Sequence, residues 1–204
     1  MHMMSKLAIA VTLATLGSLQ AAQAQQSPAA PSTASVTQRD ANQQKRIESG
    51  LQSGALNTRE AARLEAETAK VDRMQSRAMR DGALDANEAA RINGAQNRVS
   101  RDIAAEKHDA QTGNPQSASS KRMQAAVARN ANQQQRIADG VKSGSLTDRE
   151  TGRLERGQAR NAAHVAAAGS DGQMGKHEAQ RTQRAENRNS ARIAHEKHDA
   201  QSRE

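Results

Sequence analysis

Four short segments of the sequence share one pattern of polar and apolar positions. Each has a glycine, an apolar residue two positions later and a glutamate four positions after that. Glycine suits the left-handed residue that ends a helix, and a polar residue followed three positions later by glutamate is the capping box that begins the next one. Each segment therefore predicts a helix end, an apolar contact and a helix start. The four glycines are Gly54, Gly82, Gly144 and Gly172.

Between these segments, apolar residues recur with helical spacing. Ile92, Val99 and Ile103 fall at i, i+7 and i+11, which places them on one face of a helix. Strong helix formers dominate these stretches, and no stretch alternates as a strand does. We predict an all-α fold with helices at residues 39–49, 58–79, 86–110, 121–139, 148–168 and 176–200.

The sequence repeats itself at an offset of 90 residues. The stretch Ala41-Asn-Gln-Gln44 recurs as Ala131-Asn-Gln-Gln134, and about half of the aligned positions are identical. A repeat of this kind indicates duplicated structural units. We predict two tandem copies of a three-helix unit, at residues 39–111 and 121–204, joined by a linker at 112–120.

The first 24 residues have the features of a secretory signal peptide. Lys6 precedes an apolar run at 7–19, and Ala22-Gln-Ala24 supplies a small-x-small cleavage site. We expect cleavage near Ala24, a periplasmic or secreted location, and no membrane span in the mature protein. Residues 25–38 contain two of the three prolines and many small polar residues, which predicts a disordered leader.

The composition predicts a thin core. There is no Phe, Tyr, Trp or Cys among the 204 residues, and a buried methylene contributes only about 0.8 kcal/mol. We therefore expect an alanine-rich core without disulfides. The second copy should be the less ordered, because Asn161 replaces Val71 and because Gly152 and Gly157 lie inside a predicted helix.

The net charge of +8 favours anionic partners. Four arginines of the last predicted helix form a stripe that a polyanion could follow, although an ordinary solvated face explains the same spacing. Candidate partners are anionic envelope polymers or other exported proteins; the oligomeric state does not follow from the sequence. We find no set of nucleophile, base and acid, and predict a protein that is not an enzyme and needs no cofactor. The stripe comprises Arg181, Arg184, Arg188 and Arg192.

Calcium or a transition metal is the alternative ligand. Asp81, Gly82 and Glu88 match the back half of an EF-hand calcium loop. Helix capping explains the same residues, and positions one and three of such a loop would be Arg77 and Met79, which do not ligate calcium. Two histidines three positions apart could contribute to a transition-metal site. The candidate metal ligands are Asp81, Glu88, Asp139, Glu150, His195 and His198.

The repeated motifs also resemble those of known proteins. The repeats contain Gly144-Ser-Leu-Thr-x-x-Glu150 followed by Arg-Leu-Glu155, the motif Asp-Gly-x-Leu-x-x-x-Glu as at residues 81–88, and Lys-His-Asp as at residues 197–199. Together these motifs resemble those of a group of uncharacterised exported helical repeat proteins of Gram-negative bacteria. This resemblance implies export but no particular activity. The Leu146-Thr-x-x-Glu150 box is similar to the Leu-Thr-x-x-Gln box of Spy- and CpxP-type periplasmic proteins. The sequence as a whole therefore leaves three candidate functions: partner or polyanion binding, a metal- or calcium-responsive role, and a periplasmic stress chaperone.

Overall fold

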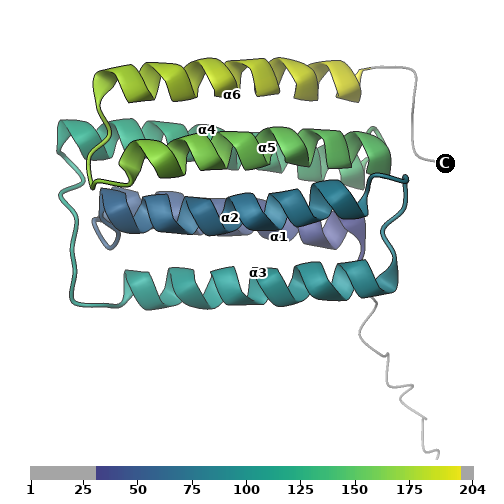
Figure 1. Cartoon of the computed structure of the whole chain (residues 1–204), viewed down its shortest axis with the longest axis horizontal. Coiled ribbons are helices and arrows are strands. Elements are labelled where there is room, and N and C mark those ends of the chain that lie inside the picture. Colours follow the sequence, from purple (N-terminus) through teal and green to yellow (C-terminus); the bar gives the residue numbers. More distant parts are fainter. Residues whose placement is uncertain (1–30, 199–204) are drawn as a thin grey trace, which may run out of the picture.

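The computed structural model describes residues 31–198, which form helices and connecting turns without any strand (Figure 1). The all-α prediction is confirmed for this part of the chain. The predicted signal peptide and the first residues of the predicted leader lie outside the described residues. The helices are α1 (Thr33–Ser53), α2 (Thr58–Ala78), α3 (Ala86–Lys107), α4 (Ala118–Lys142), α5 (Asp148–Gly169) and α6 (Lys176–Lys197).

The four predicted glycines stand at the turns that end α1, α2, α4 and α5. They are the residues with positive φ in the described chain, with values of 80°, 99°, 77° and 91°. The predicted capping boxes also form: the side chain of Asp85 accepts from the backbone N–H of Glu88, and that of Glu88 accepts from the N–H of Asp85. The turn pattern read from the sequence is therefore confirmed. The box recurs at Asn57/Glu60 and Thr147/Glu150. At the start of α6 only half of it forms: the Glu178 side chain accepts from the backbone N–H of Gly175, which has no side chain of its own.

Helix α1 begins earlier than predicted, and this corrects the predicted leader. Ser32 and Ser35 form a capping box, and Val36 is buried on the same face as Ile47. Residues 33–38 therefore belong to a packed helix. In the same way, Ser117 caps α4 inside the predicted linker, so that the helix already begins at Ala118.

Counterpart helices of the two sequence copies lie against each other. Helix α2 packs most extensively against α5, and α1 against α4. Figure 1 shows these four helices in the middle, with α3 covering one side and α6 covering the other. Helix α3 contacts α1 and α2, whereas α6 contacts α4 and α5. The copies thus meet through their first two helices.

Contacts between the copies are reciprocal. The Arg59 guanidinium donates to the carbonyl oxygen of Asp171 at 3.0 Å, and that of Arg149 donates to the carbonyl oxygen of Asp81 at 3.0 Å. Each pair is related to the other by the 90-residue offset. Reciprocity of this kind is the signature of a two-fold interface. The division into separate tandem units stays a prediction.

Small residues permit close approach in the second copy. A Cβ atom added to Gly157 would lie 1.9 Å from Asn189 Oδ1, and one added to Gly152 would lie 3.0 Å from the Cβ of Met79. These two glycines therefore let helices pack closely. The lower order predicted for this copy stays a prediction.

Polar side chains interrupt the apolar core along each central helix. On α5, Leu154 and Val165 belong to different apolar clusters, and Glu155, Gln158 and Asn161 lie buried between them. Buried polar residues are almost as numerous as buried apolar ones in the described chain. A search of the same residues found no helix that combines the length and hydropathy needed to cross a membrane.

A glycine in a turn and a glycine inside a helix predict opposite effects on stability when each is replaced by alanine. Gly82 has a φ of 99° and only the Arg149 side chain near its Cβ position, so Gly82→Ala should destabilise the fold by about 1–2 kcal/mol. Gly94 lies inside α3 with open space around it, so Gly94→Ala should stabilise it by about 0.5–1 kcal/mol. Urea unfolding followed by circular dichroism measures both. Effects of the same sign would contradict the assignment of the turn.

Candidate functional site

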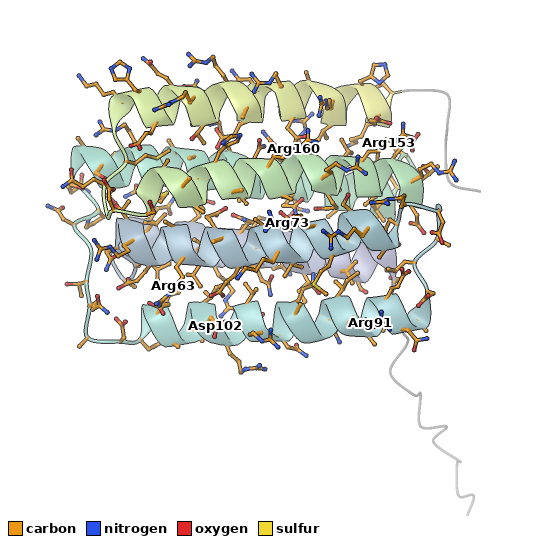
Figure 2. All side chains as sticks on the ribbon, viewed as in Figure 1. Arg63, Arg73, Arg91, Asp102, Arg153 and Arg160 are labelled. Carbon is orange, nitrogen blue, oxygen red and sulfur yellow. The ribbon has the colours of Figure 1, made fainter. Side chains whose placement is uncertain are left out.

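A basic face covers the outer side of α2 and α5. Exposed residues recur at helical spacing along both helices, and almost all of them are arginine or lysine. In the view with α2 and α5 in front, Figure 2 labels Arg63 and Arg73 from α2 and Arg153 and Arg160 from α5. We define the basic face by its ten exposed cations, which are Arg59, Arg63, Lys70, Arg73, Arg77, Arg80, Arg149, Arg153, Arg156 and Arg160.

The outer side of α1 and α4 has a different character. Its exposed residues are largely Ser, Asn, Gln and Ala, with three lysines and one aspartate, Asp139. Lys45 donates to the Gln135 side chain at 2.6 Å on this side. The outer side of α2 and α5 therefore carries more exposed cations than the outer side of α1 and α4. The three lysines are Lys45, Lys121 and Lys142.

A groove lies within the basic face between α2 and α5. It has a volume of about 480 Å³ and is lined by four arginines together with Ser76 and Gly152. Gly152 lets the helices approach closely here, because it has no Cβ atom to meet Met79. No carboxylate lines this groove, so it is a local concentration of positive charge. The four arginines are Arg80, Arg149, Arg153 and Arg156.

Ion pairs reduce the charge at two positions of the basic face. Arg63 pairs with Glu106 of α3, and Arg153 lies 4.0 Å from Glu196 of α6. Both arginines are about half exposed, so these pairs are screened by solvent. The pairs fix the two side chains without removing the basic character of the face.

The structure brings three of the four predicted arginines of the α6 stripe towards α5. Arg188 and Arg192 line a groove with Arg160, and Arg181 lines a neighbouring one with His164. Arg184 is exposed but lines neither of these grooves. The α6 stripe therefore continues the basic face, which the sequence analysis did not find on α2 and α5.

The six predicted metal ligands do not converge on one point of the described chain. Asp81 and Glu88 hold turn and capping hydrogen bonds around Gly82, and Glu150 makes the same capping contacts with Thr147. Asp139 accepts from Gln135 on the α1/α4 side, and His195 and His198 are exposed at the end of α6. None of the six belongs to a converging group of acidic or histidine side chains in the described chain. Their metal role stays a prediction.

A different group of carboxyl side chains converges in the middle of the molecule. Asp40 of α1, Asp72 of α2 and Glu155 of α5 each offer an oxygen within 4.8 Å of the others. Their exposed fractions are 0%, 1% and 0%. We call these three residues the carboxyl cluster. They converge because each takes a core position of its helix, such as Asp40 one turn after Val36.

Buried amides hold parts of this cluster in place. Gln75 and Gln96 donate to the two different oxygens of Asp40, the second at 2.6 Å. Gln134 donates to Glu155 at 3.1 Å. The Oδ1 atom of Asp72 has no hydrogen-bond partner. The cluster thus has amide donors around it, but fewer donors than oxygens.

Burial raises the pKa values of these carboxyl groups. Loss of water raises the pKa of Asp40 to about 7, although the amides of Gln75 and Gln96 oppose the shift. The pKa values of Asp72 and Glu155 lie well above the usual range, first because of burial and then because other carboxylates lie nearby. Glu65, two turns before Asp72 on α2, has its pKa raised by burial to about 8. The cluster therefore holds protons near neutral pH, unless another positive charge replaces them.

The sequence analysis missed both the basic face and the carboxyl cluster. A signal for the cluster was present, because Asp40 falls at helical spacing between Val36 and Ile47. Because the predicted first helix begins at residue 39, the apolar line through Val36 falls outside it. A polar residue in such a line indicates either a register error or a buried polar site.

These pKa values predict that the protein loses stability as the pH rises. The folded chain keeps protons on Asp40 and Glu65 that the unfolded chain releases near pH 3.8 and 4.5. Their stabilising effect is complete below those values and is lost as the pH rises through about 7 to 8. Between about pH 5.5 and 6, each group should lower the free energy of unfolding by about 1 kcal/mol per pH unit, and the contribution of Asp40 should diminish as the pH approaches 7. Urea unfolding in metal-free buffer measures the slope.

Matched variants separate these groups from surface charge. Glu65→Gln should make the slope shallower, because glutamine cannot ionise, whereas Asp139→Asn on the exposed α1/α4 side should leave it unchanged. A wild-type stability that is constant or increases from pH 5.5 to 8 would contradict the raised pKa values.

The chain was compared with models of protein families, with curated proteins and with solved structures. None of the three comparisons found a significant match. The proposals below therefore depend on the residues and contacts described above.

Proposed function

We propose that this chain is an exported, non-enzymatic helical protein that binds anionic polymers through the basic face. The observation that carries the proposal is the concentration of ten exposed cations on the outer side of α2 and α5. Counterions released from a linear polyanion would drive such binding. The three α6 arginines beside α5 extend the same surface.

The side chains of the basic face favour binding to anionic groups over recognition of nucleic-acid bases. The sequence has no aromatic residue on which bases could stack. Guanidinium groups bind phosphate, sulfate and carboxylate in a bidentate manner. Acidic polymers of the cell envelope offer these groups in repeated form, in keeping with the predicted signal peptide.

We also propose that the two sequence copies form one pseudo-symmetric body with a thin, alanine-rich core. The reciprocal contacts of Arg59 with Asp171 and of Arg149 with Asp81 support this arrangement. The basic face then spans both copies, because α2 belongs to the first and α5 to the second. A polymer bound there would contact both copies at once.

The test uses two variants that lose the same charge from opposite faces. Arg149→Gln/Arg153→Gln/Arg156→Gln removes three cations beside the groove, and Lys45→Gln/Lys121→Gln/Lys142→Gln removes three from the α1/α4 side. Binding of fluorescent dextran sulfate is measured at several salt concentrations. We expect the arginine variant to lose about tenfold or more in affinity and to show a shallower salt dependence. The lysine variant should bind nearly as wild type does.

The outcome distinguishes a defined surface from net charge. Equal losses in both variants would mean that only the total charge matters, and the basic face would be rejected as the site. Suppression of client aggregation without dextran sulfate binding would favour the stress chaperone instead.

A further inference from the structure

The two sequence copies provide an internal comparison for the carboxyl cluster. At the 90-residue offset, Asp40 corresponds to Asn130, and Asp72 corresponds to Ala162. Glu155 corresponds to Glu65, which accepts from the Asn130 amide at 3.3 Å. The fold therefore accommodates one buried acid beside an amide and an alanine. The fold therefore does not require all three acids of the carboxyl cluster.

Several buried oxygens at the cluster have no donor among the surrounding amides and hydroxyls, so they depend on the protons that the carboxyl groups keep or on a cation that replaces them. Asp72 Oδ1, Glu155 Oε1 and Gln75 Oε1 have no partner, although Asp72 is only 1% exposed and the other two residues are 0% exposed. The Gln75 amide is held beside the cluster, because its Nε2 atom donates to Asp40. In the described chain, the buried side-chain atoms without a partner are all oxygens. An occupant that satisfies oxygens must donate protons or carry positive charge.

We propose that Asp40, Asp72 and Glu155 bind a hard divalent cation, such as Mn²⁺, Ca²⁺ or Mg²⁺, in the middle of the helix bundle. The donor set contains only carboxyl and amide oxygens, which these ions prefer over softer metals. Oxygen ligands lie about 2.0–2.6 Å from such ions, so two ligands of one ion are at most about 5 Å apart. The mutual limit of 4.8 Å in the cluster meets this requirement.

The charges also balance with one ion. A divalent cation neutralises two carboxylates, and the third carboxyl group keeps its proton. Binding therefore releases protons, since the cluster is protonated near neutral pH without the ion. The site is independent of the basic face, because α1 contributes Asp40 and all three ligands are buried.

The second converging group of acids has partners that the carboxyl cluster lacks. Glu60, Glu106 and Asp109 lie near the start of α2. The Glu60 side chain accepts a hydrogen bond from the backbone N–H of Asn57. Glu106 forms an ion pair with Arg63, and the Asp109 side chain accepts from the backbone N–H of Gln111. This group supplies a control in the same molecule.

The test measures Mn²⁺ binding by the full chain at pH 7.5. The protein is treated with chelator, and Mn²⁺ is added either to the folded protein or during refolding, because the ligands are buried. Equilibrium dialysis gives the stoichiometry, and circular dichroism gives the melting temperature. We expect one tightly bound Mn²⁺ per chain and a rise of about 5–10 °C in melting temperature when the ion is at about 100 times its Kd.

The most informative variant takes its substitutions from the corresponding positions of the other sequence copy. Asp40→Asn/Asp72→Ala gives the cluster the residues found at positions 130 and 162, so it should fold, bind no Mn²⁺ at the cluster and melt at the same temperature with or without the ion. Glu106→Gln, in the second acidic group, should bind as wild type does. If the double variant does not fold, Asp72→Ala alone should weaken binding at least tenfold.

Three results would overturn the proposal. The first is a wild-type chain that binds no Mn²⁺, Ca²⁺ or Mg²⁺ stoichiometrically under either loading procedure. The second is binding that persists unchanged in Asp40→Asn/Asp72→Ala or in Asp72→Ala. The third is binding that is lost in Glu106→Gln, which would place the ion at the other acidic group.

Discussion

A chain without aromatic side chains must hold its helices together by close approach and by buried hydrogen bonds. Both devices are present among α4, α5 and α6, within the second copy. Gly157 allows α5 to approach Asn189, and the Asn189 amide donates at 3.1 Å to Gln133 and to Gln158. Buried amides of this kind stabilise only when their partners are correctly placed, because an unsatisfied polar group costs about 1–3 kcal/mol. The core therefore specifies a single register of the helices.

Much of the fold could be predicted because its signals are local. The glycine and the capping box act over fewer than ten residues, so the starts of α2, α3, α5 and α6 were predicted correctly. The starts of α1 and α4 were missed, since Ser32 and Ser117 cap them within segments that resemble linkers by composition. Local signals do not show which helices pair. The contact of α2 with α5 joins residues far apart in the sequence.

The candidate sites were less predictable for the same reason. The basic face combines stripes from two helices, and each stripe alone resembles an ordinary solvated surface. The predicted stripe on α6 was found because all of its arginines lie on one helix. In the carboxyl cluster, Asp40, Asp72 and Glu155 come from three helices and two copies. Glu88 and Glu150, which the sequence offers as candidate metal ligands, make capping hydrogen bonds in the structure.

The two-fold contacts between the copies affect how the sequences of the two halves can diverge from each other. In a dimer of identical chains, each substitution appears twice, so a carboxyl group introduced at position 40 would occur on both sides of the interface. When both halves belong to one polypeptide, each half can change alone. Asp40 accepts from Gln75 and Gln96, whereas its counterpart Asn130 donates to Glu65. Asp72 likewise has an alanine, Ala162, as its counterpart. Covalent linkage of the halves is thus what permits an acidic site on one side only, without a second copy of it at the equivalent positions of the other half.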